Sequence, residues 1–132
     1  MSLLQVQNVS RAFGGLRAVQ NVSLEVPVGS LTALIGPNGA GKTTLFALMS
    51  GFLTPDTGRI VFDGHDITGQ TPHLNAKLGM TRTFQIVQPF ASQTVRENIA
   101  VGAHLHQSHR GLALRAAEEV AERVGLSAQL DK

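Results

Sequence analysis

The first quarter of the chain alternates between apolar and polar residues. Apolar side chains occupy Leu4, Val6 and Val9, and residues 22–26 alternate from one valine to the next. Because successive residues of a strand point to opposite sides, a spacing of two places these side chains on one face. The pattern predicts a first strand around residues 4–9 and a half-buried second strand over residues 22–26.

A different pattern follows. Residues 31–35 are a short and largely apolar run, which is typical of a strand buried on both faces. A glycine-rich segment separates this run from an apolar stripe at helical spacing, formed by Leu45, Phe46, Leu48 and Met49. The stripe predicts a helix that ends near Gly51.

The second half of the chain begins with turn signals. Residues 55–58 and 63–64 have turn chemistry and flank the apolar run 59–62, which predicts another strand pair. Thr71 followed by Pro72 predicts the start of a short helix that ends at Gly79, and an extended segment resumes over residues 80–84.

From Thr94 onward the pattern becomes helical. Helices are predicted over residues 95–101 and 112–124, the second with Glu118 and Glu122 on its polar face and Gly125 at its end. No internal repeat interrupts this order of elements.

Composition narrows the class of protein. A chain of 132 residues with 42% hydrophobic content has the size and core of one ordinary domain. The formal charge of +2 is small and the basic residues are scattered, which argues against a nucleic-acid partner. No cysteine is present, so disulfides and thiolate metal sites are excluded. Since no long apolar run or signal peptide is visible, we expect no direct membrane insertion.

The glycine-rich segment between the predicted strand and helix is a phosphate-binding loop. It comprises Gly36, Pro37, Asn38, Gly39, Ala40, Gly41, Lys42, Thr43 and Thr44. Its glycines let backbone N–H groups turn inward around an anion, and the helix directs its N-terminal dipole at the same place. In this motif the lysine reaches the β- and γ-phosphates and the first threonine ligates Mg²⁺. Thr44 adds a further hydrogen-bond donor.

Three histidines near the end of the predicted third helix form a second candidate site. His104, His106 and His109 have no obvious fourth ligand, and the first two point to different sides of a helix. We interpret them as part of a solvated loop and expect no metal site there.

With these motifs in place, the chain resembles the N-terminal part of an ATP-binding cassette (ABC) ATPase. The resemblance rests on residues 13–16, the phosphate loop, residues 64–68, residues 81–85 and residues 94–99. It also includes Ala18, Val19, Gly51, Pro55 and Gly58. Within that superfamily, Phe-Gly-Gly-Leu at 13–16 and Arg-Thr-Phe-Gln at 82–85 resemble an ATPase of branched-chain amino acid importers.

The resemblance assigns roles to individual residues and implies ATP and Mg²⁺ as cofactors. Phe13 would stack on adenine, at a position where the family more often has tyrosine, and Val19 would line the same face of the nucleotide. Gln85 would reach the Mg²⁺ and the γ-phosphate, so that it acts with Lys42 in catalysis. Core packing is the alternative role for Phe13, and a glutamine without function is the alternative for Gln85.

The resemblance also implies partners. Apolar residues in a loop are typical of interfaces, and Ile86, Val87 and Phe90 would contact the coupling helix of a transmembrane permease. Local core packing is the alternative. A second ATPase subunit, identical or different, would complete the assembly, which we expect to be cytoplasmic and peripheral on the inner face of the cell membrane.

The implied fold class is α/β, a P-loop NTPase of the ABC type. The antiparallel β subdomain and part of the RecA-like core would occupy residues 1–93, and the helical subdomain would begin at residues 94–132. The family's signature, its acidic strand and its switch histidine do not occur before Lys132. We therefore interpret the fold as truncated and expect nucleotide binding without efficient hydrolysis, an open sheet edge and self-association.

Other functions are less well supported. A P-loop kinase would show an acceptor site or lid motif, and small kinases and GTPases usually open with the phosphate-loop strand. A soluble ABC protein of DNA repair or translation, or a transporter ATPase for another substrate, remains an alternative.

Overall fold

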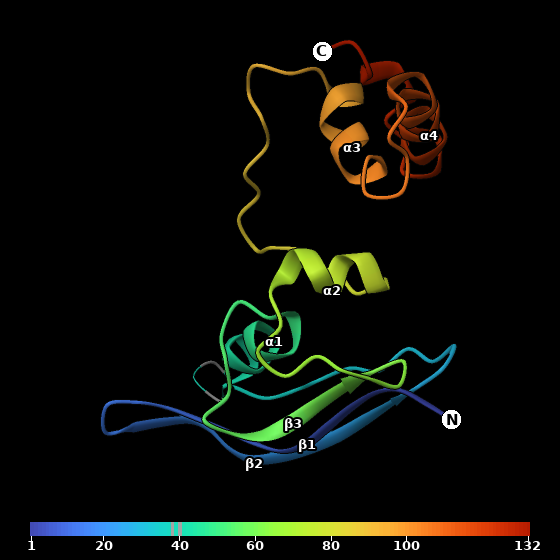
Figure 1. The fold of residues 1–132 in the computed structure, drawn as a ribbon. Coiled ribbons are helices and arrows are strands. Elements are labelled where there is room, and N and C mark those ends of the chain that lie inside the picture. Colours follow the sequence, from blue (N-terminus) through green and yellow to red (C-terminus); the bar gives the residue numbers. More distant parts are fainter. Residues whose placement is uncertain (38, 40) are drawn as a thin grey trace. The chain divides into compact units, whose positions relative to one another are not determined.

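The computed structural model describes residues 1–37, 39 and 41–132. They form two compact units, Met1–Arg82 and Thr83–Lys132, each with its own core (Figure 1). The subdomain division expected after residue 93 stays a prediction. We describe each unit by itself.

The first unit is built on a four-stranded antiparallel sheet. Its strands are β1 (Ser2–Phe13), β2 (Leu16–Pro27), β3 (Thr57–Phe62) and β4 (His65–Asp66), in the order β2-β1-β3-β4. The central strand β1 aligns its Val6 with Leu24 of β2 on one side and with Ile60 of β3 on the other. The strands predicted from alternation and from the turns are confirmed, although β1 and β2 are longer than expected.

Helix α1 (Lys42–Ser50) supplies the apolar surface that covers this sheet (Figure 1). Leu45 and Leu48 of the helix are buried in one cluster with Val6, Val9 and Ile60 of the sheet. The helix ends at Gly51, which adopts the left-handed conformation common after a helix C-terminus. Its apolar stripe was predicted correctly, except that Phe46 is exposed.

The predicted strand over residues 31–35 is wrong. These residues form no regular secondary structure, and Leu31 and Ile35 are almost fully exposed. A strand exists only through hydrogen bonds to a neighbouring strand, and the four described strands pair among themselves. The apolar composition was recognised, but the pairing that would turn it into a strand does not form among the described residues.

Helix α2 (Pro72–Leu78) begins after Thr71 and ends at Gly79, as predicted. Its Asn75 is only 1% exposed. The Asn75 amide donates to the carbonyl of Ser50 at 3.1 Å and to that of Gln70 at 3.3 Å, and accepts from the Gln70 side chain at 2.9 Å. Because Ser50 ends α1, this amide satisfies a helix-terminal carbonyl that has no partner within its own helix.

The second unit is a helical pair. Helix α3 (Val95–Ala103) begins with a capping box between Thr94 and Glu97, and helix α4 (Arg110–Arg123) starts two residues before its predicted boundary. The two helices meet through buried alanines at positions 100, 113 and 117. Small side chains allow the two backbones to approach closely, and both predicted helices are confirmed.

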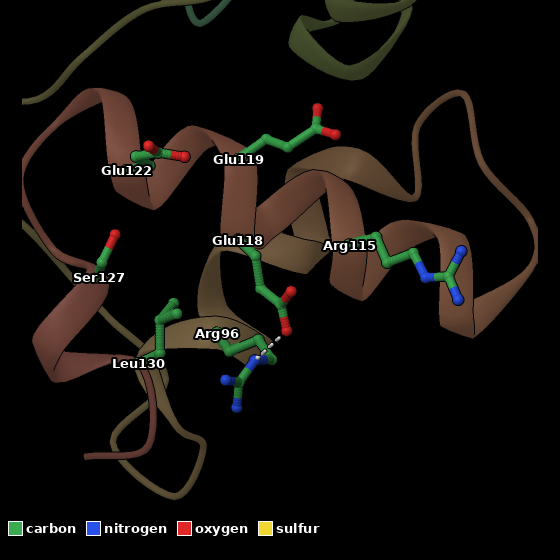
Figure 2. Close-up of a pocket in the computed structure, with 7 residues that line it drawn as sticks. All are labelled: Arg96, Arg115, Glu118, Glu119, Glu122, Ser127 and Leu130. Carbon is green, nitrogen blue, oxygen red and sulfur yellow. Dashed lines mark hydrogen bonds and ion pairs between the residues drawn. The ribbon is translucent and has the colours of Figure 1, made fainter.

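The last residues of the chain fold back onto the start of α3. The backbone N–H groups of Val95 and Arg96 donate to the carbonyls of Lys132 and Leu130, each at 3.0 Å. The guanidinium of Arg96 donates to Glu118 of α4 at 3.1 Å and also pairs with Asp131. Figure 2 shows Arg96 and Glu118 in the open polar pocket between α4 and the turn η1 (Ser127–Gln129). These contacts close the helical unit on itself.

Replacing Asn75 with leucine should destabilise the first unit by about 2 kcal/mol. The change keeps the number and branching of the side-chain heavy atoms but leaves the carbonyls of Ser50 and Gln70 without their donor in a buried setting. Thermal and urea unfolding of the chain would measure the loss. Gln20→Leu makes the same kind of change at an exposed position of β2 and should alter stability by less than about 0.5 kcal/mol. Equal effects of the two variants would contradict the role of Asn75.

Candidate functional site

The phosphate loop leads directly into α1, as its motif requires. Asn38 and Ala40 lie outside the described residues, so their predicted roles are not addressed by the structure. The first turn of α1 contains no acidic residue, and among the described residues no side chain caps its N-terminus. An uncapped helix start with free backbone N–H groups and a positive dipole end favours an anion.

Gly41 fixes the position of this helix start against the β1–β2 hairpin. Its φ of 93° lies in the left-handed region that side chains disfavour. A Cβ atom added there would lie 2.3 Å from the carbonyl oxygen of Ala18 and 3.5 Å from a methyl group of Val19. Only glycine therefore permits both the backbone conformation and the contact with β2.

Lys42 places its ammonium over the loop itself. The Nζ atom donates to the carbonyl of Gly36, the first residue of the motif, so that the side chain bridges the two ends of the loop. Thr43 is exposed in the first turn of α1, and Thr44 is half-buried. The loop thus brings together an ammonium group, a helix N-terminus and an exposed hydroxyl, which are the groups expected for a phosphate and its Mg²⁺.

The two residues predicted to contact the base differ in accessibility. Phe13 ends β1 opposite Leu16, and this residue is 43% exposed, so it is not a buried core residue. Val19 is only 5% exposed and belongs to the sheet core. Val19 therefore offers little surface to a ligand, although its methyl group borders Gly41.

Gln85 and the predicted permease-contact residues belong to the second unit. Gln85, Ile86, Val87 and Phe90 are all exposed and lie in a segment without regular secondary structure. Gln85 belongs to the second unit and the phosphate loop to the first. Its predicted contact with Mg²⁺ stays a prediction.

Two residues with clear structural roles near these sites were missed. Asn98 of α3 holds the chain at Phe90 by accepting from its N–H at 2.8 Å and donating to its carbonyl at 3.1 Å. Arg11 lies over the ring of Phe13, with its guanidinium carbon 4.9 Å from the ring centroid. The spacing of two between Arg11 and Phe13 could have indicated a shared strand face.

Metal ligands other than hydroxyl and amide groups are scarce around the loop. In the part of the chain that the structure describes, no three His, Asp or Glu side chains gather closely enough to hold a metal. The ring of His104 instead lies 3.0 Å from the carbonyl of Gln107, and His109 precedes α4. A Mg²⁺ at the loop would take its ligands from Thr43 and from phosphate oxygens, a donor set that this hard cation accepts.

Among the described helices, none has both the length and the apolar character needed to cross a bilayer.

Known proteins are similar to this chain in sequence and in fold. Residues 19–132 match the ABC transporter family. A protein of Archaeoglobus fulgidus, named a probable branched-chain amino acid transport ATP-binding protein (LivG), is 44% identical over 128 residues, covering 93% of this chain and 50% of the relative. A sulfate/thiosulfate import ATP-binding protein (CysA) of Thermosynechococcus vestitus is 40% identical over 129 residues, covering 98% of this chain and 38% of the relative.

A solved structure agrees with this assignment. The nucleotide-free ATP-binding cassette of an ABC transporter superposes with a TM-score of 0.85 at 33% identity, covering 100% of this chain and 57% of that one. The chain thus spans about half the length of these relatives. The α/β fold of the ABC ATPase cassette is confirmed, and with the family match over residues 19–132 this chain belongs to the ABC transporter family.

Proposed function

We propose that this chain belongs to the ATP-binding, energy-coupling subunit of an ABC importer and that its loop binds MgATP. The observation that carries the proposal is the contact of Gly41 with Ala18. This contact holds the N-terminus of α1, which no described side chain caps, beside the hairpin whose first strand ends at Phe13. The phosphates and the base of one nucleotide would then be held by two segments of the same unit.

Different residues of the loop and the hairpin would bind different parts of the nucleotide. The N–H groups at Gly39, at Gly41 and in the first turn of α1 would donate to phosphate oxygens, and the exposed face of Phe13 would stack on adenine. An ammonium has three donors, so Lys42 can keep its bond to Gly36 and still reach the β- and γ-phosphates. Bound Mg²⁺ would neutralise charge on those phosphates, with Thr43 as a ligand and Gln85 as the proposed second contact.

The described groups favour binding over turnover. Lys42 and the loop amides neutralise phosphate charge, but hydrolysis also needs a group that positions the attacking water. The family resemblance assigns that role to none of residues 1–132. We therefore expect this chain to bind nucleotide and to hydrolyse it inefficiently.

Transport of branched-chain amino acids is the proposed process. The support is the name of the LivG relative together with residues 13–16 and 82–85, while the CysA relative shows that similar chains occur in sulfate import. The proposed partners are a permease that contacts Ile86, Val87 and Phe90, and a second ATPase subunit. These partners would hold the chain at the cytoplasmic face of the membrane. An importer of another substrate is the alternative.

Replacing Lys42 with methionine should weaken MgATP binding by more than about tenfold. The variant removes a charge-assisted donor of about 1.5–3 kcal/mol while preserving the length of the side chain. Isothermal titration calorimetry would measure both affinities. Lys77→Met removes one positive charge from an exposed position of α2 and should bind ATP like the wild type. Unchanged ATP affinity of Lys42→Met would refute nucleotide binding at this loop.

Replacing Phe90 with serine should reduce co-purification with the permease by more than about tenfold and leave ATP affinity unchanged, because a buried aromatic anchor contributes most at an interface. Val120→Ser is the matched control, since Val120 is 47% exposed on α4 and Phe90 is 54% exposed. A Phe90→Ser chain that co-purifies as fully as the control would exclude this segment as the contact.

A further inference from the structure

Arg11 covers one face of Phe13. The two residues lie two positions apart on β1, and the Arg11 guanidinium carbon is 4.9 Å from the centroid of the Phe13 ring. A guanidinium at this distance is attracted to the ring face, and the attraction grows as the cation loses water. The Arg11 side chain is about three-quarters buried, and its Nε atom is fully covered. The ring nevertheless remains partly exposed, so surface is left for a ligand.

The Arg11 guanidinium is held in place from the other side. Its Nη1 atom donates to the carbonyl of Thr54 at 2.7 Å and lies 3.7 Å from a carboxylate oxygen of Asp56. The other oxygen of Asp56 accepts from the backbone N–H of Ala12 at 2.9 Å, and the N–H of Asp56 donates to Ser10 at 2.8 Å. These four contacts fix the end of β1, which carries Phe13, to the segment before β3.

The same strand end is connected to the phosphate loop. Arg11 aligns with Val19 across the hairpin, and the residue before Val19, Ala18, has the carbonyl that Gly41 approaches. The guanidinium and the ring thus belong to the hairpin that the phosphate loop approaches at Gly41. A ring fixed at this place has a defined position relative to the start of α1.

We propose that Arg11 is a positioning residue for recognition of the nucleotide base. It occupies one face of Phe13 and fixes the ring, so that the other face is available to a purine before the nucleotide arrives. The proposal rests on the proposed function, because it assigns a cause to the stacking of adenine on Phe13. Arg11 touches the ring and not the phosphates.

The physical effect is preorganisation. A free phenylalanine side chain loses rotational freedom when a base stacks on it, and this loss opposes binding. Since Arg11 has already restricted the ring, less of this cost falls on binding. Loss of Arg11 should weaken ATP binding by about 3- to 10-fold. Inorganic tripolyphosphate, which has no base, should be unaffected.

The test compares ATP with tripolyphosphate on the whole 132-residue chain by calorimetry. Arg11→Met keeps an unbranched apolar side chain but removes the cation and its donors, and we expect it to lower ATP affinity while tripolyphosphate affinity stays within about twofold. Arg17→Met is the matched control, since it removes the same charge from an exposed position of the same hairpin. In a Phe13→Ala background, Arg11→Met should cause no further loss of ATP affinity, because the two residues act as one unit.

Each outcome decides the proposal. Equal weakening of ATP and tripolyphosphate by Arg11→Met, or loss of folded structure in circular dichroism, would show that Arg11 is a general structural anchor and overturn the inference. Unchanged ATP affinity would overturn it as well. A wild-type chain that binds neither ligand would contradict the proposed function itself. Arg11→Lys retains a cation near the ring and should therefore recover part of the ATP affinity. The matched control, Arg17→Met, should leave the affinities for ATP and tripolyphosphate unchanged.

Discussion

The close approach of Gly41 to the carbonyl of Ala18 is the constraint on which the first unit depends. At 2.3 Å, no side chain could occupy the place of a Cβ atom there, so the phosphate loop and strand β2 meet backbone to backbone. Helix α1 leaves the loop at this contact and covers the sheet through Leu45 and Leu48. One glycine thereby links the fold of the sheet to the position of a helix N-terminus.

The sheet order explains why Phe13, the proposed base-stacking residue, and the phosphate loop lie in one unit. Strand β1 is central, so its end at Phe13 is supported by β2 on one side and by the segment before β3 on the other. The proposed phosphate binding and the proposed base stacking therefore depend on the same antiparallel sheet. The second unit is stabilised separately, by buried alanines and by the ion pairs of Arg96.

Helix ends and the phosphate loop were predictable from the local sequence, whereas contacts between residues far apart in the chain were not. Thr71 with Pro72 and the glycines at positions 51 and 79 define helix ends through their own backbone preferences, and the phosphate loop is recognised in the same way. The strand predicted over residues 31–35 is wrong because apolar composition alone cannot supply a neighbouring strand to pair with. Arg11 was missed because its partner Thr54 lies 43 residues away, and such contacts depend on the assembled sheet.

The most direct test of this account is a comparison of Gly41→Ala with Gly39→Ala by thermal unfolding of the nucleotide-free chain. Both glycines have positive φ, 93° and 85°, so both substitutions carry a similar backbone cost of about 1–2 kcal/mol. A Cβ at Gly39 would meet nothing within 4 Å, whereas one at Gly41 would overlap Ala18. The account predicts that Gly41→Ala loses a further 1–3 kcal/mol, roughly the cost of overpacking. Equal stability of the two variants would contradict it.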